Sequence, residues 1–151
     1  MPAFGRCRTG GATGDYTLVC TFSNNIESGN ATVTGGAGNV SGTPIISGNT
    51  MTINLTGVAD AQTLTVTLSG VTDQFLQTLP DTPVSMTMLI GDTTNNSVVN
   101  ASDVAQTKTA IGQAVTSGNF RTDVNASGDI NSTDVSIVKA HSGGSVSKPA
   151  K

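Results

Sequence analysis

The sequence predicts a mainly β protein with a small α part, in which an antiparallel β-sandwich precedes two short loop-helix units. From about residue 15 to residue 90, apolar residues alternate with Thr, Ser or Asn, which is the period of half-buried strands. After Gly91 the apolar positions recur at helical intervals instead. One phrase is also written twice, as GDTTNNSVVNASDVAQTK at 91–108 and TDVNASGDINSTDVSIVK at 122–139.

The first half contains four segments with strict period-two alternation. They are YTLVCTF at 16–22, TMTINLT at 50–56, TLTVTLS at 63–69 and VSMTML at 84–89. Thr suits the outer face of a pleated strand because it is β-branched. SGN at 47–49 predicts a tight hairpin, and the turn spacing predicts a sandwich of about seven strands. The expected core comprises Leu18, Phe22, Ile46, Met51, Ile53, Leu55, Leu64, Val66 and Leu68.

The domain boundaries follow from these changes of pattern. We expect a flexible N-terminal tail over 1–14, unless something holds it, because it is rich in glycine. The sandwich covers 15–90, the loop-helix units cover 91–143, and a C-terminal tail covers 144–151. Helices are expected within 101–112 and 132–143, each ending at a glycine. Their small core is expected to hold Val99, Val104, Ile111, Phe120, Ile130, Val135 and Val138.

All five acids beyond residue 90 lie in the repeated loops, whereas Lys108 and Lys139 lie on the helices. In a twelve-residue calcium loop the ligands come from positions 1, 3, 5, 7 through its carbonyl, 9 and 12. The first loop then supplies Asp92, Thr94, Asn96, the Val98 carbonyl, Asn100 and Asp103. The second supplies Asp123, Asn125, Ser127, the Asp129 carbonyl, Asn131 and Asp134. Position 8 is Val99 or Ile130, an apolar side chain beneath each loop.

Oxygen donors at every one of these positions favour a hard cation, so the sequence predicts two calcium ions. Each loop has only two metal-facing carboxylates, which predicts weak binding suited to extracellular calcium. The second loop has Gly128 at the sharp bend, where the first has Ser97, so the first is expected to be the weaker site. The alternative is that these are turns that cap helices, with Ser102 or Asp103 as one cap and Ser132 as the other.

The two phrases resemble the duplicated calcium-binding segments of dockerin domains, whose pattern is approximately Gly-Asp-x-Asn-x-Asp-Gly-x-Val-Asn-x-x-Asp. The resemblance covers about residues 91–143. It implies a two-repeat loop-helix calcium-binding domain that docks onto a cohesin, which is itself a β-sandwich. It also implies partner contacts near Ala101, Ser102, Ser132 and Thr133, with Lys108 and Lys139 nearby. Thr94, Ser97 and Ser127 depart from the pattern. The sandwich half resembles immunoglobulin-like or cohesin-like modules.

Several other classes of function lack support in the sequence. The net charge of −3 disfavours a nucleic-acid surface, and no apolar run is long enough to span a membrane. No catalytic motif is recognisable, and the single histidine, His141, is expected to be a solvated helix-end residue. A carbohydrate-binding module would need an aromatic platform, but the chain has no Trp and one Tyr. Glycosylation of Asn30 or Asn39 remains open, as does a bond between Cys7 and Cys20.

The expected function is therefore that of a non-catalytic extracellular or cell-surface module. It binds calcium and docks through its dockerin-like half onto a partner with a β-sandwich domain. The alternative is a self-assembling subunit of an extracellular filament. In that case the dockerin-like half of one copy contacts the sandwich of the next, and the N-terminal tail adds a strand to a neighbour's sheet edge.

Overall fold

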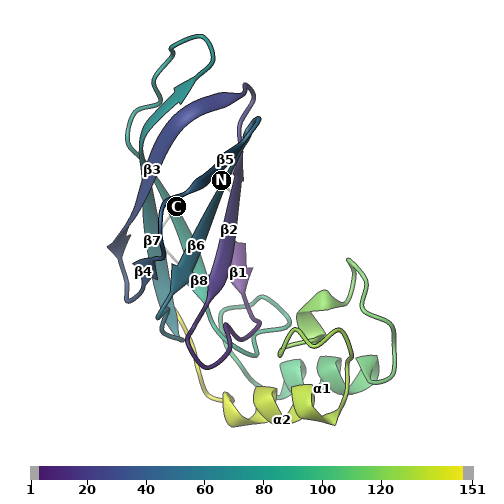
Figure 1. Ribbon diagram of the computed structural model, residues 1–151. Helices are drawn as coiled ribbons and strands as arrows, with labels where there is room; N and C mark the ends of the chain where they lie inside the picture. The colour runs from purple at the N-terminus through teal and green to yellow at the C-terminus, as the bar shows by residue number, and fades with distance from the viewer. Residues whose placement is uncertain (1–3, 148–151) are drawn as a thin grey trace. The chain divides into compact units, whose positions relative to one another are not determined.

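The computed structural model describes the backbone of residues 4–147 and the side chains of residues 7–147. The fold class is confirmed: the described residues are mainly β, with two short α-helices near the C-terminus (Figure 1). The strands are β1 Phe4–Arg6, β2 Tyr16–Thr21, β3 Ile26–Gly35, β4 Asn39–Val40, β5 Ile45–Ser47, β6 Thr50–Thr56, β7 Gln62–Asp73 and β8 Thr82–Met88. The helices are α1 Ala101–Ala110 and α2 Ser132–Ala140, with a 3-10 turn, η1, at Phe120–Thr122 between them.

The strands form two sheets. One has the order β1-β8-β7-β3, and the other has the order β2-β6-β4, with β5 also paired to β6. The second sheet contains the predicted hairpin, because Ser47 pairs with Thr50 across Gly48 and Asn49. Gly48 has a φ of 57, the left-handed conformation that such turns favour. All the pairs with assigned register in this second sheet are antiparallel, as the alternation predicts.

The long strand β3 was not among the four segments that the sequence singles out. Its sequence IESGNATVTG carries two glycines, and its pairing with β7 shifts register at three places. Because each bulge reverses which side chains point inward, the period-two signal is broken along the strand. A Cβ at Gly29 would lie 2.2 Å from the terminal methyl group of Met51 and 3.1 Å from Val71, so a larger residue there would require the Met51 side chain to move.

The sandwich core contains most of the expected side chains. Leu18, Met51, Ile53, Leu55, Leu64, Val66 and Leu68 are buried, but Phe22 and Ile46 are only half-buried, so their assignment to the core is corrected. Phe22 follows the last residue of β2, and Ile46 lies in the three-residue strand β5, which pairs with β6 off the main path of the sheet. Further buried side chains are Met86 and Met88, in the alternating segment 84–89, and Ile26, Ala31, Val58 and Val71, which lie outside the four alternating segments.

The chain divides into two compact units. One contains Ala12–Ala59 and Leu64–Ser85, and the other contains the residues up to Gly11 together with Asp60–Thr63 and Met86–Lys151. The second unit thus combines the loop-helix repeats with the start of the chain. In it β1 pairs in parallel with the end of β8, so that Gly5 is opposite Thr87. This differs from the flexible tail expected over 1–14, although residues 1–3 lie outside the described residues.

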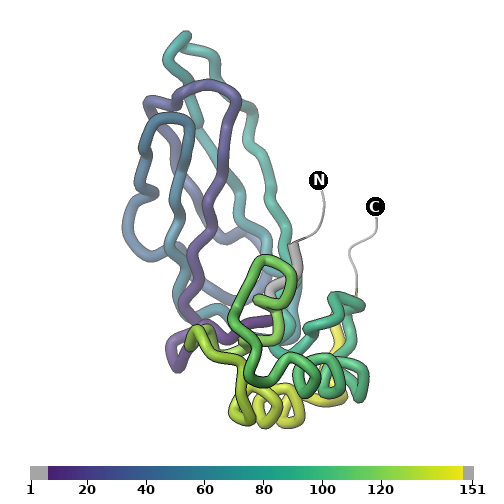
Figure 2. The backbone as a smooth tube through the Cα atoms, turned by 90° about the vertical axis from the view of Figure 1, so that its right-hand side faces the viewer, coloured from purple at the N-terminus to yellow at the C-terminus, as the bar shows by residue number. Residues whose placement is uncertain are grey.

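Figures 1 and 2 both show α1 and α2 side by side. Leu89, Val99, Val124 and Val138 form the buried cluster of this unit, with Val104 and Ile137 packed against it. Ile130 and Val135 are also buried, as expected. Ile111 and Phe120 are 46% and 41% exposed, so their assignment to the core is wrong. Ile111 is the residue that caps α1, and Phe120 starts η1, where it lies beside the Arg121 guanidinium.

Candidate metal centre

The first repeated loop is organised around two buried carboxylates. Asp92 is 5% exposed and Asp103 is fully buried. The Asn96 amide donates to Oδ1 of Asp92 at 3.0 Å, and the Ser97 amide donates to its Oδ2 at 2.9 Å. Asp103 accepts from the Thr94 amide and hydroxyl, both at 2.9 Å, and from the Asn100 amide at 2.8 Å. Positions 1 and 12 of the predicted calcium loop are therefore the two acids around which the backbone folds.

The second loop repeats this arrangement. Asp123 and Asp134 are both fully buried. The Ser127 and Gly128 amides donate to the two oxygens of Asp123 at 3.0 and 3.1 Å. Asp134 accepts from the Asn125 amide at 3.3 Å and from the Asn131 amide at 2.9 Å. Each of these bonds lies thirty-one residues beyond its counterpart, so the sequence repeat is also a repeat of hydrogen-bonding geometry.

The bend at position 6 is left-handed in both loops. Gly128 has a φ of 90, and Ser97 adopts a φ of 71 at the matching position. A non-glycine residue in this region is strained by roughly 1–2 kcal/mol. The geometry of the first loop is thus retained without the glycine, but at a cost in stability.

The buried acids show what kind of group the loops fit. Removing a carboxylate from water is unfavourable unless cations or hydrogen-bond donors compensate for it. Each loop buries two such groups, and its other predicted ligands are amide, hydroxyl and carbonyl oxygens, which is the ligand chemistry of calcium. Among residues 7–147 no three His, Cys, Asp or Glu side chains gather as a metal cluster. A metal in these loops therefore needs neutral oxygens to complete its shell.

The remaining ligand positions lie at the surface of the loops. Most of them are exposed, namely Thr94, Asn96, Val98, Ser127 and Asp129. Asn125 is half-buried. The Asn96 side chain accepts from the Val98 amide at 3.0 Å, and the Ser127 hydroxyl donates to the Asp129 carbonyl at 3.1 Å. These contacts bring positions 5 and 7 together in both loops.

Position 9 of each loop caps the helix that follows. The Asn100 side chain accepts from the Ser102 amide at 2.8 Å, and Asn131 accepts from Thr133 at 2.8 Å. Asp103 and Asp134 complete a capping box by accepting from the Asn100 and Asn131 amides. The expectation that Ser102, Asp103 or Ser132 would be the N-cap is therefore wrong. The predicted calcium loop and the helix cap use the same residues, so the interpretation as a calcium loop and the interpretation as a helix-capping turn do not exclude each other.

Each loop also pairs with the segment that follows the opposite helix. The Val99 amide donates to Gly144, and the Gly143 amide donates to Val99, at 2.8 and 2.9 Å. In the other repeat, the Gly112 amide donates to Ile130 at 3.0 Å. Because position 8 supplies both this pairing and a buried side chain, the two loops hold each other in place.

The start of the chain contributes to this site, which the sequence pattern does not predict. Arg8 Nη2 donates to Asp123 Oδ2 at 2.6 Å, and its Nε donates to the Asp123 carbonyl at 2.7 Å. The Thr9 amide donates to Val124 at 2.7 Å, and the Gly91 amide donates to Cys7 at 2.9 Å. No local pattern marks these contacts, because the arginine precedes its partner by 115 residues.

Both cysteines are free thiols in this structure. Burial raises the pKa of the Cys7 thiol, and nearby Arg121 opposes this shift. Burial also raises the pKa of Cys20. The Cys7 Sγ donates to the Arg121 carbonyl at 3.6 Å. A protonated, buried thiol has the role of a small packing group here.

His141 lies at the end of α2, as the sequence predicts, but its side chain is half-buried and not fully solvated as expected. Its Nδ1 lies 2.9 Å from the Ile137 carbonyl, and its Nε2 lies 3.7 Å from Asp60 Oδ2. The other oxygen of Asp60 accepts from the Ile90 amide at 2.7 Å. These contacts tie the end of α2 to the backbone before the first loop, which is a structural role.

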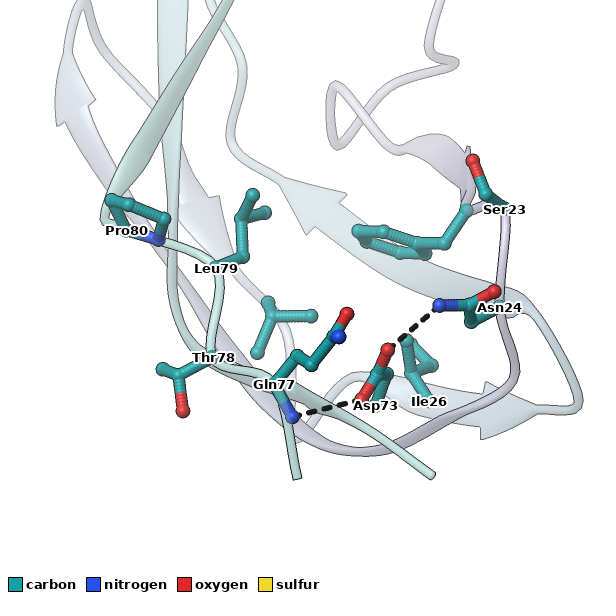
Figure 3. A pocket seen from close by; sticks show the side chains of 10 residues that line it. Ser23, Asn24, Ile26, Asp73, Gln77, Thr78, Leu79 and Pro80 are labelled. Atoms are coloured by element: carbon teal, nitrogen blue, oxygen red, sulfur yellow. Dashed lines mark hydrogen bonds between the residues drawn. The ribbon is translucent and has the colours of Figure 1, made fainter. Parts of the chain in front are cut away.

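The sandwich unit has a cavity of about 230 Å³ beside the loop between β7 and β8. Figure 3 shows Asp73 at its edge, bonded to Asn24 and to the Gln77 amide. Burial alone would raise the pKa of Asp73, but bonds from Asn24, Gln77 and Phe75 outweigh it and hold the pKa below its ordinary value. Asp73 therefore accepts hydrogen bonds as a charged anchor for this loop.

Comparison with known proteins bears on the loop-helix unit. A family model, Dockerin type I domain, matches residues 90–141. No curated protein and no solved structure matches the chain. The matched range includes both loops with their buried acids and both capped helices. The match supports a dockerin-like calcium-binding domain over residues 90–141.

Proposed function

We propose that this chain is a non-catalytic, extracellular or cell-surface assembly module that docks onto a partner with a cohesin-like β-sandwich. The match at 90–141 carries the proposal, because dockerin domains bind protein partners and calcium. The paired loops support two ions, one held by Asp92 and Asp103 and the other by Asp123 and Asp134, together with the neutral positions named above. Calcium would neutralise the buried acids and so hold both helix starts in one arrangement.

The docking surface proposed is the start of each helix. Four side chains there are exposed at matching positions of the two repeats: Ala101, Ser102, Ser132 and Thr133. Lys108 and Lys139 are exposed further along the same helices. Small residues allow a partner's backbone to approach closely, and each lysine offers a charge at the rim. Capping by Asn100 and Asn131 fixes the direction of both helix starts.

The proposal is tested by calorimetric titration of the full chain with purified cohesin modules at millimolar calcium. Binding is expected, with loss of at least tenfold in affinity when Ser102 and Thr133 are both replaced by Arg. Replacing Ser41 and Ser117 by Arg serves as the control, because these serines are exposed and lie on neither α-helix. Equal binding by both double variants would place the docking surface elsewhere, and absence of binding to every cohesin tested would reject a cohesin-like partner.

A second candidate function is self-assembly into a filament through head-to-tail contacts and strand donation. The observation that favours it is the parallel pairing of β1 with the end of β8, since this edge of the sheet accepts an added strand. Electron microscopy at millimolar calcium tests it. Concentration-dependent filaments that vanish when residues 1–14 are deleted are expected; monomers at every concentration would reject it.

Within residues 4–147, neither α-helix is long and apolar enough to cross a bilayer. The proposed extracellular location is supported by the calcium loops, whose few acids suit a calcium-rich medium. Detection of the protein in the culture medium or on the surface of intact cells tests it.

A further inference from the structure

In the second calcium loop, the aspartate at position 1 binds an arginine side chain in addition to the amides that it shares with the first loop. Asp92 and Asp123 each accept from the amides at positions 5 and 6, with distances between 2.9 and 3.1 Å. Asp123 additionally accepts the Arg8 guanidinium at 2.6 Å and presents its carbonyl to the same side chain at 2.7 Å. Since two amides already orient each aspartate, the main addition made by Arg8 is positive charge.

The segment that delivers this charge is bound across the starts of both repeats. Cys7 is 3% exposed, and its carbonyl accepts from the amide of Gly91, directly before Asp92. The Thr9 amide donates to Val124, directly after Asp123. Arg8 lies between these anchors, with its side chain 32% exposed, while the Asp123 side chain is fully buried. The guanidinium is therefore the cation that compensates a buried carboxylate of the loop.

We propose that the second loop contains a guanidinium-binding site, filled by Arg8, and that its occupation opposes calcium binding to the same loop. The inference rests on the proposed calcium site at Asp123. A divalent ion on one oxygen of this carboxylate and a guanidinium on the other repel each other, and both draw on the same negative charge. Binding to the two sites is reciprocal, so calcium in the second loop must weaken the hold on residues 7–9.

Arg8 has two opposite effects on calcium affinity: it orients Asp123, and its charge repels the ion. The larger of the two decides whether Arg8 raises or lowers the affinity. A group that orients a metal ligand commonly improves metal affinity by tenfold or more. Here that gain is small, because the first loop holds Asp92 with the same two amides. Repulsion between a unit charge and a divalent ion a few ångströms apart is worth about tenfold in affinity even in a high dielectric, which is about 1.4 kcal/mol. Charge therefore outweighs orientation.

The experiment follows each loop separately by NMR during a calcium titration of the full chain. The amides of Gly128 and Ser97 report the second and first loops, since each donates to the aspartate at position 1. In Arg8→Gln the midpoint at Gly128 is expected to fall about tenfold in calcium concentration, with no change at Ser97. Arg8→Lys, which keeps the charge, is expected to resemble the original protein. Lys139→Gln is the matched control for the loss of one positive charge. Because Lys139 is at an exposed helix position, this variant is expected to leave both midpoints unchanged.

A second measurement needs no substitution at Arg8. Hydrogen exchange of the Thr9 amide in the original protein is expected to become about tenfold faster when calcium saturates the second loop. The proposed antagonism between Arg8 and calcium is overturned by an unchanged or higher Gly128 midpoint in Arg8→Gln. It is also overturned if the exchange rate of the Thr9 amide does not change with calcium. A Gly128 amide that does not respond to calcium in any variant shows instead that the metal site itself is wrongly assigned, and the inference falls with it.

Discussion

Ser97 and Gly128 occupy the same position of the two loops and share a left-handed backbone, with φ values of 71 and 90. Both amides donate to an oxygen of the aspartate at position 1. The loop geometry therefore imposes the conformation, whichever residue stands there. Serine is strained in this region and glycine is not, so the two sites differ in stability although their hydrogen bonds match.

Ser97→Gly is accordingly expected to stabilise the protein by about 1 kcal/mol, because it removes the left-handed strain. The same change should tighten calcium binding at the first loop. Chemical denaturation with and without calcium measures both effects. Gly128→Ser is the reciprocal control and should destabilise by a similar amount, since a Cβ at Gly128 meets nothing within 4 Å and only the backbone is affected. A destabilised Ser97→Gly protein would contradict this account.

Removal of calcium should destabilise the loop-helix unit, because four carboxylates are buried in two small loops: Asp92, Asp103, Asp123 and Asp134. An ion that binds only the folded state stabilises it by about 2.7 kcal/mol at a hundred times its dissociation constant. Circular dichroism during heating, with calcium or with a chelator, measures the change in Tm of the helices. Magnesium at the same concentration is the control, since it dehydrates reluctantly and demands a tighter octahedron. An unchanged Tm with chelator would exclude structural calcium.

The sequence predicts well the parts of this fold that depend on local pattern. Both loops are found by counting positions, because their acids are hydrogen-bonded to amides only three to nine residues away. The strand β6 coincides with its predicted range because its alternation is unbroken. For Ile111 and Phe120 the pattern gives the wrong prediction. The burial of an apolar residue at the end of a short element depends on which other segments pack against that end, and the periodicity does not contain this information.

The contacts that the sequence does not predict are those between distant segments. Leu89 and Val124 complete the buried cluster of the loop-helix unit, but neither belongs to a helix. Arg8 reads as part of a glycine-rich tail until the fold brings it to Asp123. Such pairings depend on the path of the whole chain, so no local pattern in a single sequence predicts them.

Acid is expected to weaken the sandwich unit through Asp73. Its pKa is depressed in the folded state, so its bonds contribute stability fully above the unfolded pKa of about 3.9 and lose it as pH falls through the lower folded pKa. The urea midpoint, followed by circular dichroism of the strands, should therefore fall below about pH 4. Asp73→Asn should lower the midpoint at neutral pH and flatten this acid dependence. Parallel pH curves for the two proteins would show that Asp73 is not the group responsible.

Two isoleucines test the arrangement of the loop-helix core. Ile130 is 3% exposed beneath the second loop, before α2, whereas Ile111 is 46% exposed directly after the C-terminal end of α1. Ile130→Ala removes buried methyl groups and is expected to cost about 2–5 kcal/mol in unfolding free energy. Ile111→Ala deletes the same atoms at the surface and should change it by less than about 0.5 kcal/mol. Denaturation of both variants at saturating calcium makes the comparison, because metal occupancy is then equal. Similar losses for the two would mean that Ile111 is covered in solution, as the helical pattern alone predicts, and that the end of α1 packs differently from this structure.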